Sequence, residues 1–220
     1  MVSLINTGIE RGWYLNEVFI FGFYRDYTEE GNFDEFIESL IESEWETYWK
    51  HIFNVAHTDR LAILKEAKKA FESQLYGAAI HIFFSQSDGI FSEKFSKRNQ
   101  EVQLYKKSGS NAKQEFNKYL TEVIDRESFE RLLEHYKDAS LLRRMYNEAY
   151  KAGFSRESID VVKNTKEILS EDDLIIPNRH GVLHGIHKRY ATKRHALKCF
   201  SLLLFVIFAI HGDDMYSKEL

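Results

Sequence analysis

The sequence is poor in cysteine and proline. Among its 220 residues there is one cysteine, Cys199, and one proline, Pro177. A single cysteine in an apolar run excludes a disulfide framework and favours a reducing compartment, so we expect a cytoplasmic protein. A single proline leaves long helices uninterrupted. The N-terminus has no basic region followed by a clean apolar stretch, so no secretory signal is expected.

Long apolar runs are also missing. The best candidate for a membrane segment is residues 199–210, which is twelve residues long. A helix needs about 20 apolar residues to cross a bilayer. We therefore predict that this run is a buried core helix and that the protein has no membrane partner.

Several sequence motifs for catalysis and ligand binding are absent. There is no Walker loop, no G-x-G-x-x-G fingerprint, no Cys/His zinc framework and no G-x-S-x-G elbow. No cofactor is therefore expected.

Acidic residues are absent from residues 174–212, although the whole chain has a formal charge of -4. Histidines accumulate in the same segment, and so do basic residues: Arg179, Lys188, Arg189, Lys193, Arg194 and Lys198. A basic, histidine-rich segment in an acidic protein indicates an anionic ligand, and phosphate is the usual one.

Hydrophobic periodicity predicts an all-α protein. Apolar residues recur at three- and four-residue spacing over residues 33–55, and further helices are expected on either side of Gly77 and over residues 196–210. The expected caps and ends are Thr58, Pro177, Thr192 and Gly212. The 44% hydrophobic content suits one substantial core.

Two regions flank or interrupt these core helices. Residues 1–32 are rich in glycine and aromatics and are expected to form an arm packed on the body, with a short strand permitted near residues 18–21. Residues 33–220 are predicted to form a single domain. Within it, residues 96–173 are interpreted as a helical insertion of shorter amphipathic helices around an exposed loop.

The segment Asn178-Arg179-His180-Gly181-Val182-Leu183-His184-Gly185 contains the most reactive combination of side chains. Histidine transfers protons near neutral pH. Arginine offers a planar fork that matches phosphate oxygens. Together they supply what phosphodiester cleavage without a metal needs.

These residues resemble the motif of the HEPN-domain ribonucleases. Arg179 is followed by the polar His180, three further residues and His184, as in the arginine–polar–three residues–histidine motif of that superfamily. Residues 75–90 also look like the central helix of such proteins, and the resemblance covers residues 58–95 and 175–210. It implies a HEPN-like helical bundle and a metal-independent endoribonuclease, of the branches found in toxin–antitoxin, abortive-infection and antiviral defence systems.

The resemblance assigns roles to individual side chains. His184 would be the general base or acid that takes the proton from the ribose 2′-OH, and Arg179 would hold the phosphate. His180 would orient the phosphate or the other histidine, and Asp88 would support the motif. RNA and an antitoxin or defence protein are the expected partners. The remaining residues expected to contact RNA are Asn178, His187, Lys188, Arg189, Lys193, Arg194 and His195.

A homodimer is the expected assembly. Residues five apart on an ideal helix point about 140° apart, so Arg179 and His184 do not share a face. A distorted turn at Gly181, or two motifs meeting across a two-fold axis, would bring them to one phosphate. The final helix is apolar on more than one face, which also suggests that a second copy covers it.

Three alternatives remain open from the residues alone. His184 could be hydrogen-bonded in the core, with Arg179 bound to a carboxylate such as Asp88. His180, His184 and His187 have a spacing that could bind zinc. A non-catalytic helical module could use the same basic patch to hold RNA or a protein.

Overall fold

The computed structural model describes residues 2–16, 19, 31–95 and 175–217, and every regular element among them is helical. The elements in chain order are α1 (Val2–Glu10), α3 (Phe33–Ser43), α4 (Trp45–Val55), the 3₁₀ turn η1 (Thr58–Arg60), α5 (Leu61–Glu72), α6 (Tyr76–Phe95), α11 (Arg179–Leu183) and α12 (Lys193–Ser217). The all-α prediction is confirmed for this part of the chain. The predicted insertion at residues 96–173 and most of the strand permitted near residues 18–21 lie outside the described residues.

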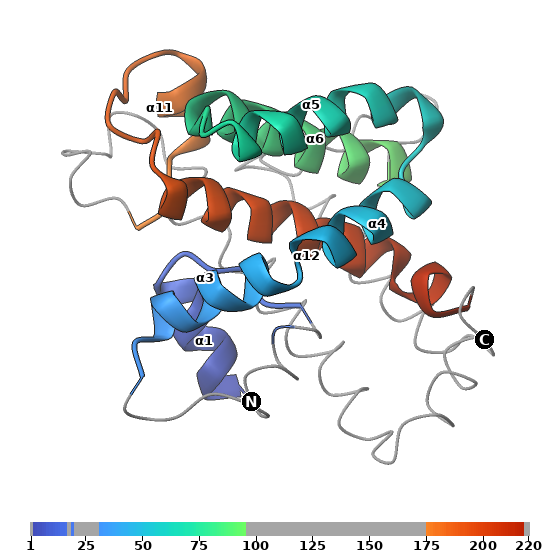
Figure 1. Cartoon of the computed structure of the whole chain (residues 1–220), viewed down its shortest axis with the longest axis horizontal. Helices are drawn as coiled ribbons and strands as arrows, with labels where there is room; N and C mark the ends of the chain where they lie inside the picture. The colour runs from blue at the N-terminus through green and yellow to red at the C-terminus, as the bar shows by residue number, and fades with distance from the viewer. Residues whose placement is uncertain (1, 17–18, 20–30, 96–174, 218–220) are drawn as a thin grey trace.

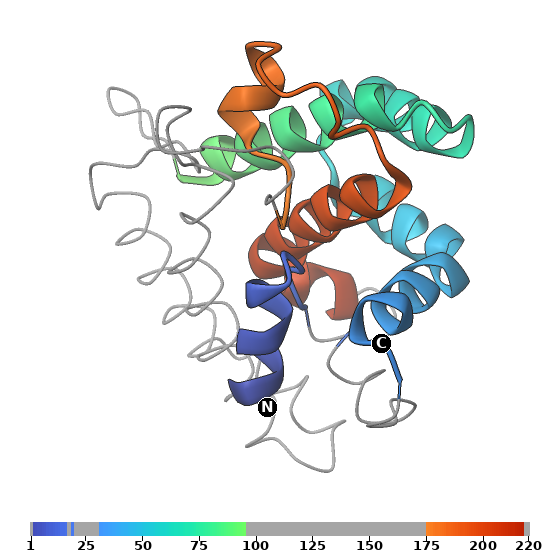
Figure 2. The same ribbon diagram turned by 90° about the vertical axis from the view of Figure 1, so that its left-hand side faces the viewer.

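α12 is the central helix of the described structure. It runs between the layer formed by α5 and α6 and the layer formed by α1 and α3, with α4 crossing beside it (Figures 1 and 2). All side chains from Ala196 to Ile210 are buried. Its most extensive contacts are with α6, and α4 and α3 cover further parts of it. A helix that is apolar on all sides is stable only when it is covered on all sides, and this arrangement provides that cover.

By length and composition, the helical segment Lys193–His211 could also cross a membrane. In this structure, 83% of its most apolar stretch is buried inside the protein. The same burial bears on the dimer argument. Since one chain buries residues 196–210, this helix does not require a second copy to cover it.

The turn between α5 and α6 differs from the prediction. The expected interruption at Gly77 lies within the first turn of α6, and the chain reverses at Ser73–Leu75 instead. Gln74 has φ +62°, and Leu75 N–H donates to Ala70 O at 2.8 Å, which closes the end of α5. A non-glycine residue in this left-handed conformation is uncommon, so the sequence carries no signal for it.

The single helix predicted over residues 33–55 is divided at Glu44 into α3 and α4. The backbone of Glu44 leaves the helical region, with φ −104° and ψ 14°. No proline or glycine marks this break. The two helices pack against different parts of α12. α3 lies near the N-terminal end of α12, and α4 lies beside a later part of it (Figure 1). The change of direction between α3 and α4 therefore follows from packing against α12. The three- and four-residue spacing of the apolar residues continues through Glu44 without a change.

Three expected helix ends also differ. Thr58 does not cap α5: it begins η1, where His57 Nδ1 accepts from Asp59 N–H. α12 continues through Gly212 to Ser217. Pro177 precedes α11 by two residues and is not in its first turn. The fourth prediction is confirmed, because Thr192 Oγ1 accepts from His195 N–H at 3.2 Å at the start of α12.

The N-terminal arm is held to the body by apolar and polar contacts. Trp13, Tyr14 and Leu15 are buried, and Tyr14 stacks edge-on against Phe205 of α12. Ser201 Oγ accepts from Tyr14 N–H at 3.1 Å. The arm thus covers the side of α12 that lies away from α5 and α6.

Asp34, in the first turn of α3, connects the arm to α12. Its carboxylate accepts from Trp13 Nε1 at 2.6 Å and pairs with Arg11 at 3.0 Å. It also lies 3.9 Å from Nζ of Lys198, which is buried, donates to Ile175 O and sits over the Trp13 ring. Burial lowers the pKa of Lys198, and the Asp34 charge opposes that shift. The Asp34 carboxylate of α3 therefore contacts both the N-terminal arm and α12.

We predict that Asp34→Ala destabilises the fold by about 2–3 kcal/mol, because it removes a charged hydrogen-bond acceptor and leaves the buried Lys198 without its nearby carboxylate. Urea unfolding followed by circular dichroism measures the change. Glu66→Ala, at an exposed position of α5, is the matched control and should stay within about 0.5 kcal/mol. Equal stability of the two variants would contradict the anchoring role of Asp34.

Candidate active site around Arg179 and His184

Asn178 begins the short helix α11. Its side-chain oxygen accepts from Gly181 N–H at 2.8 Å, and the residue is completely buried. Asparagine is among the best N-cap residues because its oxygen replaces a missing helical acceptor. Asn178 was expected to contact RNA, and the structure places its side chain inside the protein as the cap of α11.

The chain folds back over α11 immediately after it ends. Gly185 has φ +67°, and the N–H groups of Ile186 and His187 both donate to Gly181 O, at 2.8 and 3.0 Å. This brings the His187 ring directly onto Gly181. A Cβ at Gly181 would lie 2.5 Å from Cε1 of that ring, so only glycine fits.

His187 was expected to bind RNA, but its ring is buried in this fold-back. Its Nδ1 has no hydrogen-bond partner among the residues that the structure describes. The ring therefore acts as a packing element beneath α11. The position of His187 also concerns the alternative of a zinc site formed by His180, His184 and His187. Within the described ranges, no group of three possible metal ligands comes together.

Arg179 is anchored to α6. Its Nη2 lies 3.5 Å from Oδ2 of Asp88, and the two side chains are one-third and one-fifth exposed. The contact joins residues 91 positions apart in the chain. This pairing agrees with two predictions from the sequence. One gave Asp88 a supporting role, and the other was the alternative in which Arg179 binds a carboxylate. A guanidinium has five N–H donors, and at 3.5 Å Asp88 makes a long contact with one of them.

His180 and His184 form a close pair. Their ring centroids are 4.2 Å apart with an interplanar angle of 57°, and both residues are exposed. The spacing of four residues places them one turn apart on the same face of α11. His184 ends the helix, and its N–H donates to His180 O at 3.1 Å. The alternative that buries His184 in the core is therefore wrong, and the partner of His184 on its own helix is His180 rather than Arg179.

A second contact with α6 holds the chain beyond the histidine pair. His81 Nε2 lies 3.0 Å from Tyr190 Oη, and His195 Nδ1 lies 3.0 Å from the Tyr190 carbonyl. Burial lowers the pKa of His195, so its neutral form is favoured in this contact. His195 thus faces the backbone rather than a solvent-exposed ligand.

Sequence reasoning missed the contribution of His81 and Tyr190. Neither belongs to a motif, and the two are 109 positions apart. Ala191, next to Tyr190, packs beside Gly77 of α6, where an added Cβ would lie 3.4 Å from Cβ of Ala191 and make an ordinary contact.

The basic segment is partly neutralised in space. Arg194 pairs with Glu38, and Lys193 pairs with Glu42, both on α3. The hydrogen bond to Glu42 raises the pKa of Lys193, so its charge is retained within the pair. Lys188 and Arg189 lie exposed on the loop between α11 and α12.

Comparison of the chain with protein-family models, with curated proteins and with solved structures finds no match. The chemistry of the site therefore rests on its own residues. Two exposed imidazoles stand side by side on a capped turn, next to an arginine held by a carboxylate. This arrangement can donate and accept protons and attract an anion.

We predict that Gly181→Ala destabilises the protein by about 1–3 kcal/mol, because the added methyl group forces the His187 ring out of its position. Thermal or urea unfolding measures the loss. Gly77→Ala is the matched control: its methyl group meets only ordinary contacts, and we expect no loss or a gain of up to about 1 kcal/mol. Similar losses in both variants would show that the fold-back does not confine His187.

Proposed function

We propose that this protein is a metal-independent endoribonuclease whose catalytic groups are His184, His180 and Arg179. The observation that carries the proposal is the exposed His180/His184 pair, with ring centroids 4.2 Å apart. Histidine is the side chain most often used for general acid–base catalysis, and two adjacent imidazoles can serve both proton transfers of one reaction. The resemblance of the motif to HEPN ribonucleases adds to this argument.

In the proposed reaction, His184 removes the proton from a ribose 2′-OH. The 2′-oxygen then attacks the adjacent phosphorus, and the bond from phosphorus to the 5′-oxygen breaks. His180 gives a proton to the departing 5′-oxygen. The products are a 2′,3′-cyclic phosphate and a 5′-hydroxyl end. Arg179 stabilises the negative charge that develops on the phosphoryl oxygens.

The surroundings of the pair support this use. Two residues of α6 contact the segment that carries the histidines. Asp88 contacts Arg179, which precedes the pair in the sequence, and His81 contacts Tyr190, which follows it. Groups that are fixed before the substrate arrives do not need to be ordered during the reaction. Lys188 and Arg189 are exposed on the adjoining loop and are the proposed contacts to the RNA backbone.

The proposed assembly is a homodimer that forms through α11. Leu183 and Ile186, on either side of His184, are 44% and 50% exposed and give an apolar surface beside the histidine pair. A two-fold contact at these residues would bring the histidine pairs of two chains together. The biological role proposed from the resemblance is that of a cytoplasmic toxin or antiviral effector with an antitoxin or defence partner.

A second candidate is a non-catalytic module that binds RNA or a protein through the same surface. The Arg179–Asp88 ion pair favours it, because the carboxylate offsets the charge that a phosphate would meet. Both candidates are compatible with RNA binding. They differ in whether cleavage occurs and whether it depends on His184.

We expect His184→Ala to lower the rate of RNA cleavage by about 100- to 10,000-fold, which is the usual effect of removing a proton-transfer group. Cleavage of total RNA by the purified protein measures the rate, and circular dichroism checks the fold. His51→Ala is the matched histidine control and should cleave normally, because His51 belongs to α4, which Figure 1 shows away from α11. Equal cleavage by folded His184→Ala would remove His184 from the catalytic site. Absence of cleavage by the wild type, with RNA still bound, would favour the binding module.

We expect cleavage to persist in EDTA and to leave 2′,3′-cyclic phosphate ends. Carboxylates are the usual protein ligands of Mg²⁺ and Mn²⁺, residues 174–212 contribute none, and Asp88 is paired with Arg179. Mass spectrometry of short RNA products identifies the ends. Complete loss of cleavage in EDTA, with recovery on adding zinc, would contradict the metal-independent mechanism.

A further inference from the structure

The two exposed imidazoles of α11 lie close enough for one metal ion to bind both. His180 and His184 are four residues apart, and the His184 N–H donates to His180 O at 3.1 Å, so the helical register continues as far as His184. Two histidines at this spacing on one helix face also supply two of the zinc ligands in the H-E-x-x-H motif. The ring centroids of the pair are 4.2 Å apart.

The distance between the rings suits coordination of a single ion. Zinc–nitrogen bonds are about 2.0–2.1 Å long, so a coordinated imidazole has its centroid about 3.2 Å from the ion. Two such rings at an angle of about 90–110° have centroids about 4.5–5.2 Å apart. The observed separation is 4.2 Å. Small side-chain rotations that separate the rings by up to about 1 Å would complete the geometry.

The third histidine of the segment does not take part. The ring of His187 is buried against Gly181, and the described residues include no group of three possible metal ligands. Structural zinc sites have four protein ligands, and catalytic sites have three. A site with two protein ligands leaves its other positions to water, so a bound ion would exchange with the solution.

Coordination to neutral imidazole, rather than charge, would hold such an ion. Imidazole nitrogens suit Ni²⁺, Cu²⁺ and Zn²⁺, whereas Mg²⁺ prefers oxygen ligands. The surroundings do not attract cations in general: Asp88 offsets the charge of Arg179, and Lys188 and Arg189 are exposed on the next loop. This part of the surface therefore selects for ions that bind imidazole strongly.

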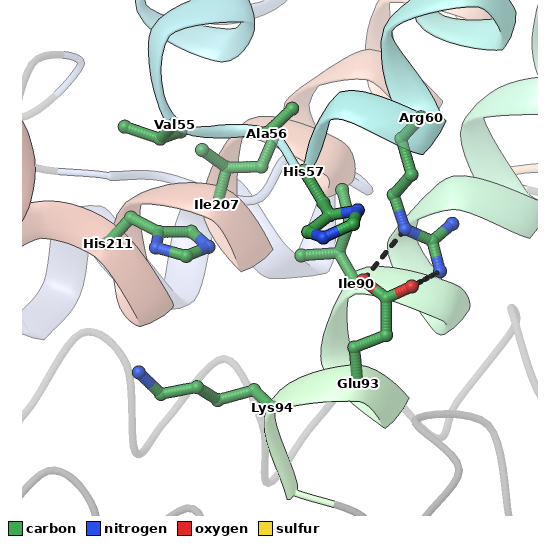
Figure 3. A pocket seen from close by; sticks show the side chains of 9 residues that line it. All are labelled: Val55, Ala56, His57, Arg60, Ile90, Glu93, Lys94, Ile207 and His211. Carbon is green, nitrogen blue, oxygen red and sulfur yellow. Dashed lines mark hydrogen bonds and ion pairs between the residues drawn. The ribbon is translucent and has the colours of Figure 1, made fainter.

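Other histidines of the described residues are placed differently. His57 and His211 both line the pocket between η1 and α12, but Figure 3 shows their rings apart, with His57 beside Arg60. His81 and His195 are each in contact with Tyr190. Within the described part of the chain, the α11 pair therefore combines exposure with a second imidazole at close range.

We infer that His180 and His184 form a two-ligand site for a divalent transition-metal ion of the Ni²⁺, Cu²⁺ and Zn²⁺ class. Binding of the ion does not depend on the ribonuclease proposal. It uses the same two side chains, however, so a bound ion would regulate whatever reaction they perform.

The test is a titration of the full chain, prepared without a histidine tag, with ZnCl₂. Two-dimensional NMR of isotope-labelled histidine rings follows each imidazole separately, and the alanine variants described below assign the signals of the pair. We expect the ring signals of His180 and His184 to shift together and saturably, with a Kd of about 100 μM or tighter. Mg²⁺ at the same concentration should leave both signals unchanged.

His180→Ala and His184→Ala should each weaken zinc binding at least about tenfold, because one imidazole must then hold the ion alone. Both side chains are exposed, so the fold should persist, and circular dichroism checks it. His57→Ala is the matched control: it removes an exposed histidine that lies 3.4 Å from Asp59, and it should bind zinc as the wild type does. The inference is overturned if the pair shows no saturable shift at about 1 mM ZnCl₂, or if either α11 variant keeps the wild-type affinity. It is also overturned if His57→Ala loses as much affinity as they do.

The consequence for RNA cleavage rests on the proposed function. Zinc bound to both rings occupies the nitrogen lone pairs that proton transfer needs, so ZnCl₂ should inhibit cleavage at concentrations near its Kd, and EDTA should restore it. Zinc binding without any RNA cleavage would remove the ribonuclease proposal and leave the metal site. Cleavage that depends on His184 but occurs without zinc binding would remove the metal site alone. Full cleavage by the zinc-saturated protein would overturn the inhibitory effect.

Discussion

The burial of α12 is the constraint on which the rest of the structure depends. Apart from Lys198 and Ser201, its side chains from Ala196 to Ile210 are apolar on all sides, so the chain must place protein on every side of it. α6 covers it most extensively, while α3, α4 and the N-terminal arm cover other parts. The bend between α3 and α4 and the anchoring of the arm by Asp34 both follow from this requirement.

α6 connects the core to the segment that carries the histidine pair and to Arg60. One broad face, which includes Phe83 and Phe84, is buried. His81 and Asp88 contact the segment that carries the histidine pair, and Gln86 and Glu93 bind Arg60 of η1. The polar residues of this helix thus fix the positions of residues that are distant in the sequence. A change in how α6 packs on α12 would move both groups of residues.

Ion pairs in the folded chain offset part of the positive charge of residues 174–212. In the sequence, residues 174–212 contain no acidic residue. In the folded chain, Glu38 and Glu42 of α3 meet Arg194 and Lys193, and Asp34 lies near Lys198. The charge therefore has a structural use at the start of α12. Lys188 and Arg189 lie exposed on the loop after α11.

The sequence by itself determined the helical class, the buried character of the final helix, the Thr192 cap and the four-residue spacing of His180 and His184, because these depend on neighbours within a few turns. It did not determine the breaks at Glu44 and Gln74, since neither position carries proline or glycine. Only the tertiary structure decided that Arg179 meets Asp88, that Tyr190 meets His81 and that Arg194 meets Glu38. These partners are 91, 109 and 156 residues apart, so local periodicity has no access to them. The His180/His184 pair followed from four-residue spacing on one helix, but its exposure was decided by the fold-back of His187 onto Gly181.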